Sequence, residues 1–324
     1  ELGIPVMERA EAWGHIMRDY DNVVCLSGTH GKTTSTSMMT MMTIEAQMDP
    51  TVMVGSNLPA IGGTLRIGGK GCFVAESCEY TNSFLRFAPT VSVILNVEED
   101  HLDFFKDIND IIHSFHEFAE LTPMNGLVVV NHDDPNAMRA VAHIDRRIRT
   151  FGTTSDADVY PTEVRDENGY YRFTVNIDGK EYAKVALSVP GRHNMLNALA
   201  CCAAAEFLGV PGEAAEKGLN KFTGSSRRFQ LVGKMPNGAT VVDDYAHHPS
   251  EMKATLSTAK EMHFDRILCA FQPHTYTRTK ALFPEFVDAL KQCDQAILAP
   301  IYAAREQNTP IIKLFPTFGE PTKR

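Results

Sequence analysis

The glycine-rich segment 28–34 has the residue types and spacing of a phosphate-binding loop. Its residues are Gly28, Thr29, His30, Gly31, Lys32, Thr33 and Thr34. An apolar run, Val23 to Leu26, precedes it and a helical pattern follows it, so backbone N–H groups and the positive helix end would face an anion. Lys32 would reach the β and γ phosphates of a nucleotide, and Thr33 would ligate Mg²⁺. Leu26 stands where the standard Walker motif has its first glycine, so an incidental turn is the alternative interpretation.

Acidic and imidazole side chains follow two later apolar runs, 72–75 and 91–95. Glu76 comes directly after the first run, and the residues after the second include Asn96, Asp100 and His101. The carboxyl ends of parallel strands meet at one edge of a sheet, beside a phosphate loop. Mg²⁺ prefers oxygen ligands, and histidine is a common metal ligand. We therefore expect a metal site of Thr33, Glu76 and His101, with a solvated strand end and a loop histidine as the alternatives for the last two.

The elements that would position these residues alternate between short apolar runs and helical stretches. The apolar runs lie at 23–26, 51–54, 72–75, 91–95 and 127–130, and the helical patterns begin at Lys32 and span 107–121 and 193–208. This alternation predicts an α/β fold with a mostly parallel sheet. Apolar and polar residues alternate through 159–189, around turns at 167–169 and 178–179. We expect a small antiparallel insertion there.

A second series of strands and helices begins after Phe229. We expect strands at 240–244, 266–271 and 295–299, and helices at 249–262 and 278–292. The predicted organisation has three parts: residues 1–22 as the remnant of a preceding domain with its linker, 23–228 as the central P-loop domain, and 229–324 as a partial Rossmann-like α/β domain. A length of 324 residues agrees with at least two domains.

Composition excludes several classes of protein. With 44% hydrophobic and 22% charged residues the chain is typical of globular proteins, and its net charge of −9 argues against a nucleic-acid surface. Seven cysteines without CxxC spacing indicate neither a zinc ribbon nor a disulfide framework. No apolar run is long enough to span a membrane, and the first residues lack a signal-peptide pattern. We therefore expect a cytoplasmic protein.

Further motifs extend this pattern along most of the chain, from residue 23 to about 308. They are Glu76-Ser77-Cys78-Glu79, Ser83-Phe84-Leu85, Asn96 to Asp103, Gly191-Arg192-His193-Asn194 with Asn197-Ala198, Arg227-Arg228-Phe229-Gln230, Asp243 to Pro249, and Phe271 to Thr279. With the phosphate loop, these motifs in this order resemble the Mur ligase family, which builds the peptide stem of bacterial cell-wall precursors. Within the family, the resemblance is to the branch that adds L-alanine.

The resemblance implies a reaction, its cofactors and its substrates. ATP, with Mg²⁺, would phosphorylate the carboxylate of UDP-N-acetylmuramate, and the amine of L-alanine would attack the acyl phosphate. Lys32, Glu76 and His101 would take catalytic roles, the last two as magnesium ligands. A second magnesium would reduce the repulsion between the carboxylate and the γ phosphate. No obligate protein partner is implied.

The resemblance also assigns residues to the nucleotide. His193, Asn194 and Asn197 would contact adenine, since amides offer a donor and an acceptor together. Arg228 would reach the phosphates, and Asp244 would accept hydrogen bonds from the ribose. Without the resemblance, Asn194 would be interpreted as a helix N-cap.

The same resemblance places the amino-acid substrate at the second series of strands. His247, His274 and Arg278 follow two of its predicted strand ends, where open α/β sheets bind ligands. The planar fork of Arg278 suits a carboxylate, although a surface salt bridge is the ordinary role of a lone arginine. Some family members carry a second arginine where Thr275 stands, so fewer contacts would hold the carboxylate here.

The sequence departs from the family at several points. It lacks most of the first, UDP-binding domain, and its C-terminal end after Asn308 is unfamiliar, so we expect a fragment that binds ATP weakly and does not ligate alone. Several relatives carry a carbamylated lysine on the helix matching 107–121, which has no lysine here. The alternatives are a murein peptide ligase that adds a tripeptide, a P-loop NTPase that acts as a switch, and a non-catalytic nucleotide-binding protein.

Overall fold

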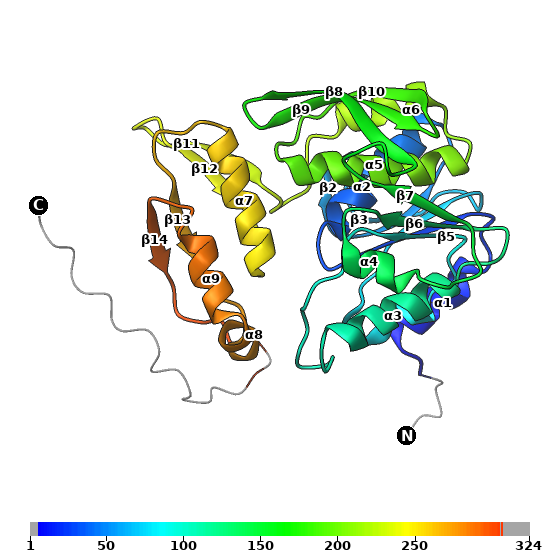
Figure 1. The fold of residues 1–324 in the computed structure, drawn as a ribbon, viewed down its shortest axis with the longest axis horizontal. Coiled ribbons are helices and arrows are strands. Elements are labelled where there is room, and N and C mark those ends of the chain that lie inside the picture. The colour runs from blue at the N-terminus through cyan, green and yellow to red at the C-terminus, as the bar shows by residue number, and fades with distance from the viewer. Residues whose placement is uncertain (1–5, 305, 307–324) are drawn as a thin grey trace, which may run out of the picture.

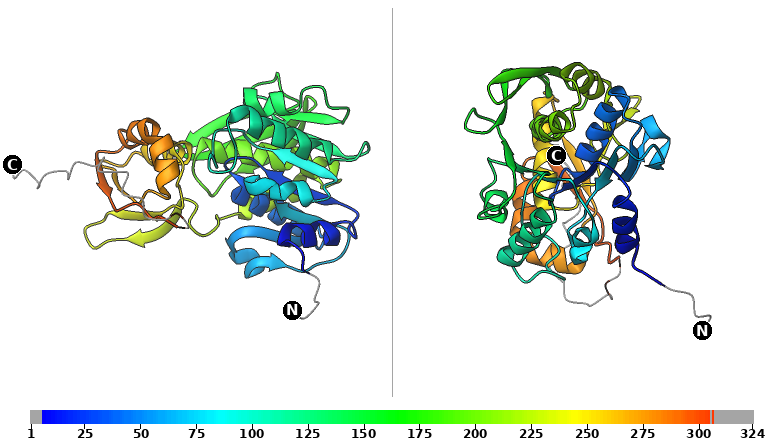
Figure 2. Two further views of the ribbon diagram at one scale, coloured as in Figure 1. Left: turned by 90° about the horizontal axis from the view of Figure 1, so that it is seen from below. Right: turned by 90° about the vertical axis from the view of Figure 1, so that its right-hand side faces the viewer.

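A ten-stranded sheet forms the centre of the larger part of the molecule, and a smaller part lies beside it (Figures 1 and 2). The computed structural model describes residues 6–304 and residue 306. The sheet has the strand order β10-β9-β8-β7-β6-β5-β1-β4-β2-β3. Its strands are β1 (Val23–Ser27), β2 (Thr51–Leu58), β3 (Gly63–Arg66), β4 (Phe73–Glu76), β5 (Val91–Ile94), β6 (Leu127–Asn131), β7 (Ile148–Phe151), β8 (Val159–Glu167), β9 (Tyr170–Ile177) and β10 (Lys180–Ala186).

The α/β fold with a mostly parallel sheet is confirmed. Strands β2, β4, β1, β5, β6, β7 and β8 pair in parallel, whereas β3 pairs antiparallel with β2. The predicted insertion is the antiparallel set β8, β9 and β10, with tight turns at 168–169 and 178–179. Asn168 and Asp178 adopt left-handed backbone conformations before glycines, as short hairpin turns require.

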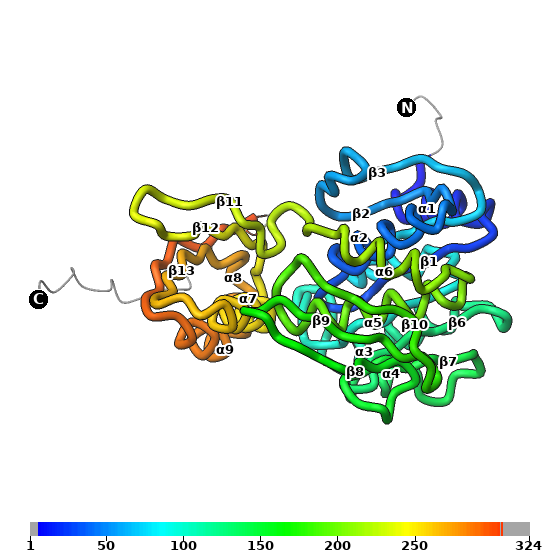
Figure 3. Tube along the Cα trace, turned by 90° about the horizontal axis from the view of Figure 1, so that it is seen from above, coloured from blue at the N-terminus to red at the C-terminus, as the bar shows by residue number. Residues whose placement is uncertain are grey.

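Helices cover both faces of this sheet (Figures 1 and 3). One face carries α2 (Lys32–Glu45), α5 (Arg192–Phe207) and α6 (Gly212–Lys221), and the other carries α1 (Arg9–Met17), α3 (Ile108–Glu120) and α4 (Pro135–Ala140). Two short 3-10 helices, η1 (Pro59–Ile61) and η2 (Tyr80–Arg86), follow β2 and β4. Strand β1 is buried throughout, with Val24 and Leu26 in one core and Val23 and Cys25 in the other. A continuous apolar run therefore marks a strand covered on both faces.

The smaller part contains the antiparallel pair β11 (Gln230–Lys234) and β12 (Thr240–Asp243) and the parallel pair β13 (Leu268–Phe271) and β14 (Gln295–Leu298). Its helices are α7 (Pro249–Glu261), α8 (Tyr276–Ala281) and α9 (Phe283–Leu290). Its core joins residues from α7, α9 and β13. Strand β11 was not predicted. The predicted tail beyond residue 306, and residue 305, lie outside the described residues.

The single helix predicted at 278–292 is wrong, because the structure has two helices there. Helix α8 begins earlier, at Tyr276, and the chain bends at Leu282, with φ −109° and ψ 26°, before α9 begins. Pro284 has no N–H to donate to the carbonyl of Lys280, so a continuous helix would lose a hydrogen bond at this point. The strand predicted from residue 266 also begins two residues later, at Leu268.

Within residues 6–304 and 306, we find no helix with the length and apolar character needed to cross a membrane.

Helices α2 and α6 approach closely enough to require a glycine. A Cβ on Gly218 would lie 2.7 Å from the Cα and N atoms of Met42. We predict that Gly218→Ala lowers the free energy of unfolding by about 1 to 2 kcal/mol, because the overpacking outweighs the better helix propensity of alanine. Urea unfolding followed by circular dichroism measures this change.

Gly71→Ala is the matched control, because no atom lies within 4 Å of a Cβ at that position. Equal stabilities of the Gly218 and Gly71 variants would contradict the proposed close packing of α2 and α6.

Candidate functional site

The predicted phosphate-binding loop, at the start of segment 28–34, joins β1 to α2. Asn96, which comes shortly after β5, holds this loop in place. Asn96 accepts from the backbone N–H of His30 at 2.7 Å, donates to the His30 carbonyl at 3.1 Å, and its own carbonyl accepts from Thr29 N at 3.1 Å. Strands β4 and β5 flank β1 on either side. The residues after these strands therefore border the loop, as the parallel-sheet rule predicts.

Two glycines give the loop its shape. Gly28 has φ 144° and Gly31 has φ 84°, both in the region that favours glycine. A Cβ on Gly31 would lie 2.7 Å from Asn197 Oδ1, and one on Gly28 would lie 2.9 Å from Leu95 Cβ. The loop is thus a narrow cradle at the N-terminus of α2, with a lysine beside it. This combination fits a nucleotide phosphate.

Lys32 is folded against its own loop and a buried carboxylate. Its ammonium donates to Gly28 O at 2.6 Å, Thr29 O at 3.1 Å and Glu79 Oε2 at 2.9 Å. An ammonium has three protons, and these contacts use all of them. Burial disfavours the charged ammonium, but the Glu79 carboxylate outweighs it and raises the pKa of Lys32 above its usual range. A phosphate that binds Lys32 must therefore displace one of these partners.

Two of the three predicted metal ligands, Thr33 and Glu76, contact each other, whereas the third, His101, lies beside Glu79. Thr33 Oγ1 donates to Glu76 Oε1 at 3.1 Å, and Gly55 N donates to the other Glu76 oxygen at 2.7 Å. His101 Nε2 is 3.9 Å from Glu79 Oε1. Burial, with the nearby cations, lowers the pKa of His101 despite neighbouring carboxylates, which favours the neutral imidazole that metals bind. The hydroxyl and carboxylate oxygens of Thr33 and Glu76 suit Mg²⁺.

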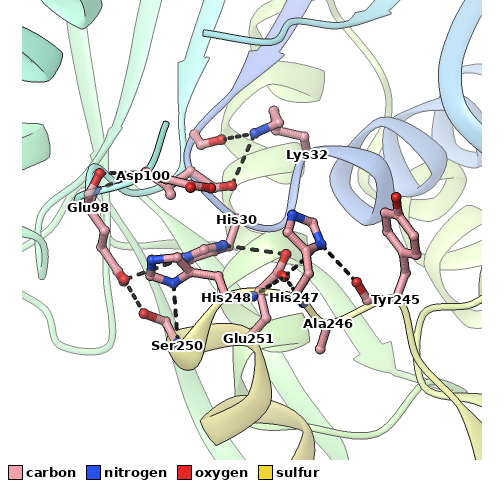
Figure 4. A network of polar contacts seen from close by, with 12 residues as sticks. His30, Lys32, Glu98, Asp100, Tyr245, Ala246, His247, His248, Ser250 and Glu251 are labelled. Atoms are coloured by element: carbon pink, nitrogen blue, oxygen red, sulfur yellow. Dashed lines mark hydrogen bonds and ion pairs between the residues drawn. The ribbon is translucent and has the colours of Figure 1, made fainter. Parts of the chain in front are cut away.

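A different group has three potential ligand atoms mutually within 4.8 Å, namely His30, Glu98 and His248 (Figure 4). His30 Nε2 lies 3.4 Å from Glu98 Oε2, and His30 Nδ1 lies 3.5 Å from Glu251 Oε1. Burial would lower the pKa of His30, but the two carboxylates raise it to about 9. Because a metal must displace the proton of this cationic histidine, we interpret the group as an ion-pair network.

This network joins the smaller part of the molecule to the predicted phosphate-binding loop. His248 Nε2 lies 2.9 Å from the carbonyl oxygen of Glu99, and Ser250 Oγ donates to Glu98. Glu251 lies 3.6 Å from Arg228 Nη1 and accepts from His247 N at 2.9 Å. Burial opposes the ionisation of Glu251, but His30, His247 and Arg228 hold its pKa well below the usual range. Helix α7 thus places a carboxylate among the cations at the loop.

One cavity, of about 220 Å³, lies on the side of the loop that faces α5. All of the residues expected to contact the base, ribose and phosphates outside the loop line it: His193, Asn194, Asn197, Arg228 and Asp244. The N-cap alternative for Asn194 is wrong, because Gly191 is the N-cap and Asn194 Nδ2 donates to Pro190 O at 2.7 Å. Burial lowers the pKa of His193 to about 4.

Asp244 is occupied by donors of the protein itself. It accepts from Ala246 N at 2.7 Å, Phe229 N at 3.0 Å and Thr255 Oγ1 at 3.0 Å. Burial raises the pKa of this carboxyl group. The side chain therefore fixes the entry to the smaller part, in addition to lining the cavity.

A second cavity, of about 290 Å³, lies on the other side of the loop. Its lining includes Lys32, Tyr80, Asp100, His101, Tyr245, His247, His274, Thr275 and Arg278. The structure therefore brings His101, expected at the metal site, to the same space as His247, His274 and Arg278, expected at the amino-acid site. Arg278 is bound there by Asp100, with Nε and Nη2 at 3.0 and 2.9 Å from Oδ1.

Family models match nearly all of the region just described. The model described as "Mur ligase middle domain" matches residues 26–205, and the model described as "Mur ligase, glutamate ligase domain" matches residues 227–315. The chain belongs to the Mur ligase family.

Individual relatives agree with this assignment. The chain is 49% identical to the UDP-N-acetylmuramate-L-alanine ligase of Agathobacter rectalis over 95% of its own length and 67% of that protein. The UDP-N-acetylmuramate-alanine ligase structure of Thermotoga maritima is 29% identical to this chain, with TM-score 0.74. The match covers 89% of this chain and 64% of that protein. The UDP-N-acetylmuramate:L-alanyl-gamma-D-glutamyl-meso-diaminopimelate ligase structure of Neisseria meningitides is 28% identical, with TM-score 0.63 and coverages of 70% and 74%. The chain thus spans about two thirds of the curated relative's length.

Three carboxylates of this Mur ligase were not among the predicted site residues, although each binds a predicted cation. Glu79 binds Lys32, Asp100 binds Arg278, and Glu251 lies beside Arg228 and His30. Glu79 and Asp100 stand within motifs that the sequence displays, close after β4 and β5. The strand-end rule that found Glu76 also brought Asp100 to this edge without giving it a role, and it could have found Glu79 as well. Glu251 gave no such signal, because two of its partners, His30 and Arg228, come from other segments of the chain.

The cationic state of His30 predicts a stability that depends on pH. Its folded pKa of about 9 exceeds the ordinary histidine pKa of 6.5, so its ion pairs stabilise the fold fully below pH 6.5 and lose this effect as pH rises through 9. We predict that His30→Gln lowers stability at pH 6 by on the order of 1 kcal/mol and has a smaller effect above pH 9. Thermal unfolding across this pH range measures the difference.

His113→Gln is the control, because His113 is exposed and lies 3.8 Å from Glu117 on its own helix. A difference between wild type and His30→Gln that stays constant from pH 6 to pH 10 would contradict the ion-pair interpretation.

Proposed function

We propose that this chain carries the ATP-binding and amino-acid-binding machinery of a ligase that joins L-alanine to UDP-N-acetylmuramate through an acyl phosphate. One observation carries the proposal. The two cavities lie on either side of the predicted phosphate-binding loop. They share four lining residues, His30, Gly31, Arg228 and Glu251. A nucleotide with its base in the first cavity would therefore present its terminal phosphate to the second. The alanine ligases among the relatives support this choice of substrates.

In this proposal residues 28–34 bind the phosphates of ATP. Lys32 exchanges Glu79 for the β and γ phosphates, and the N–H groups at the start of α2 point at the same charge. Thr33, Glu76 and His101 would hold magnesium. The metal, when bound, neutralises charge so that the substrate carboxylate can approach the γ phosphate. The proposed use of ATP agrees with the cytoplasmic location expected from the sequence.

The base and ribose of ATP are proposed to occupy the first cavity. His193, Asn194 and Asn197 would contact adenine. Asn197 Nδ2 donates to Asn194 Oδ1 at 3.2 Å, so the two amides already have a fixed relative orientation. Arg228 lies 3.4 Å from Thr33 Oγ1 and can reach the phosphates with a small change of partner. Asp244 would accept from one ribose hydroxyl with the lone pair that its three protein donors leave.

The amino acid is proposed to bind in the second cavity. Arg278 would bind its carboxylate, with His247 and His274 beside it. The rings of His247 and His274 lie 5.8 Å apart between their centroids, so they form one wall of this space. Thr275 adds no second guanidinium, and its side chain instead accepts from Arg278 N at 3.4 Å to begin α8. The arginine is thereby held at the start of a short helix.

We propose a domain boundary near residue 229, with α1 grouped with the central domain because Ala10 and Met17 pack in its core. Contacts such as His248 to Glu99 and Arg278 to Asp100 join the two parts across the loop. Closure of the two parts would exclude water, which would otherwise hydrolyse an acyl phosphate.

A tripeptide in place of L-alanine is the second candidate. The Neisseria meningitides ligase, whose name includes a peptide substrate, has nearly the same identity to this chain as the alanine ligase of Thermotoga maritima. The higher identity to the Agathobacter rectalis alanine ligase favours L-alanine.

We predict that, in a chimera of this chain with the rest of the Agathobacter rectalis ligase, His101→Ala retains nucleotide affinity within about threefold but lowers ligation at least 100-fold, because His101 lies in the second cavity and would act on the γ phosphate. Binding of a fluorescent ATP analogue and phosphate release measure the two effects. His113→Ala is the control, since His113 is exposed on α3. Near-normal ligation by the His101 variant would refute its metal role.

An amino-acid screen tests the function itself. The assay uses a chimera in which this chain replaces the matching two thirds of the Agathobacter rectalis ligase, with the unaltered relative as positive control. ATP-dependent phosphate release is measured with UDP-N-acetylmuramate and each of a panel of amino acids and a tripeptide. We expect L-alanine to stimulate release most.

Other results of the screen would support the alternatives. A preference for the tripeptide would transfer the assignment to a peptide ligase. Release that is independent of any amino acid would indicate a hydrolytic switch, and nucleotide binding without turnover would indicate a non-catalytic protein.

A further inference from the structure

The second cavity contains an ion pair between the two parts of the molecule. Arg278, on α8, donates from Nε and Nη2 to Asp100 Oδ1 at 3.0 and 2.9 Å. The side chains are only 11% and 7% exposed, and both residues line the cavity. A buried ion pair contributes little net stability, since desolvation of both charges offsets their attraction. Its position in a proposed substrate cavity suggests a role in binding.

The geometry of the pair leaves capacity on both partners. Asp100 Oδ1 accepts from His101 N at 2.7 Å as well as from Arg278, whereas Oδ2 lies 3.8 Å from His101 Nε2, beyond hydrogen-bond distance. The guanidinium has five donors, and its Nη1 lies 3.3 Å from His274 Nδ1. A carboxylate could therefore bind the arginine fork in place of Oδ1, and a cation could bind Oδ2.

We propose that Asp100 and Arg278 together recognise the zwitterion of the incoming amino acid. Arg278 binds the α-carboxylate, and Asp100, released from Arg278, binds the α-ammonium. The two charges of an α-amino acid are attached to one carbon, so one amino acid can bind a protein cation and a protein anion that line the same cavity side by side. The inference rests on the proposed function and adds Asp100 to it as a residue that determines specificity.

The arrangement also orients the substrate. Asp100 lies on the side of Arg278 that faces the predicted phosphate-binding loop. Asp100 Oδ2 is 3.8 Å from His101 Nε2, and His101 Nε2 is 3.9 Å from Glu79 Oε1. Glu79 in turn contacts Lys32. An ammonium on Asp100 therefore faces the loop at which the acyl phosphate would form, whereas the carboxylate faces the smaller part. The nucleophile is the neutral amine that forms when this ammonium gives one proton to the Asp100 carboxylate, so this orientation suits the reaction.

This recognition predicts discrimination against substrates with only one charge. A simple carboxylate would bind Arg278 but leave the Asp100 carboxylate unpaired in a buried site. A simple amine would leave the arginine without a new partner. Leaving one buried charge without its partner is strongly unfavourable.

The test compares L-alanine with propionate, which lacks the amine, in the presence of Mg²⁺ and a non-hydrolysable ATP analogue. Binding to the whole chain is measured by calorimetry or by ligand-observed NMR. We expect wild type to bind L-alanine at least tenfold more tightly than propionate. Asp100→Asn should reduce this preference to less than about threefold and leave the affinity for the ATP analogue unchanged.

Glu99→Gln is the matched control, since it removes a neighbouring but exposed negative charge. It should keep the wild-type preference. Thermal unfolding establishes that each variant is folded. The comparison of L-alanine, propionate and ethylamine on wild type needs no variant and tests the same claim.

Two results would overturn the inference. An unchanged preference in Asp100→Asn would do so, as would an equal weakening of L-alanine and ATP-analogue binding, which would make the pair a structural bridge. If wild type binds another amino acid instead of L-alanine, the proposed substrate is wrong, and the Asp100 claim is tested with that amino acid and its deaminated analogue. If wild type binds the ATP analogue but no amino acid, the Asp100 claim fails.

Discussion

The pairing of buried cations with internal carboxylates is the constraint on which this site depends. Lys32, Arg228 and Arg278 point into spaces where we propose that anionic substrates bind, and each lies beside a carboxylate, Glu79, Glu251 or Asp100. An unpaired charge in such a site would be costly to bury. The carboxylates therefore permit the site to fold without its ligands. When a ligand binds, each cation exchanges its internal carboxylate for an anionic group of the ligand. Few charges are therefore left unpaired in the buried site.

The sheet determines which groups can take part in this exchange. Strand β1 has β4 and β5 as its neighbours, so the residues after all three strands meet at one edge. Glu76 and Glu79 come from β4 and its following turn, and Asp100 and His101 come from the segment after β5. The second part of the molecule adds Arg278 and Glu251 to the same edge, through α8 and α7. The site is thus complete only when the two parts are in contact, which agrees with a reaction that must exclude water.

Much of this arrangement could be predicted from local sequence. A buried apolar strand followed by Gly-rich residues and Lys32 specifies the loop, and the strand-end rule placed Glu76 and His101 beside it. The apolar alternation specified the antiparallel insertion. These features could be predicted because they depend on residues that are neighbours in the chain or in a regular sheet.

The remaining features depend on contacts that local patterns do not encode. His30 and Arg228, two of the cations beside Glu251, come from other segments of the chain, so the local sequence gave no sign of these contacts. The break at Leu282 arises from one proline inside a helical pattern. The role of Gly191 as N-cap, rather than Asn194, is decided by how the chain enters α5 from the antiparallel insertion.

The central claim is that phosphate displaces Glu79 from Lys32. A crystal structure of the chain with Mg²⁺ and a non-hydrolysable ATP analogue tests it most directly. The account predicts that the base lies beside Asn194 and Asn197, that the phosphates lie on residues 28–34, and that Lys32 Nζ contacts the β or γ phosphate and no longer Glu79. A nucleotide bound elsewhere, or a Lys32 that keeps all three of its present partners with the phosphates in place, would contradict it.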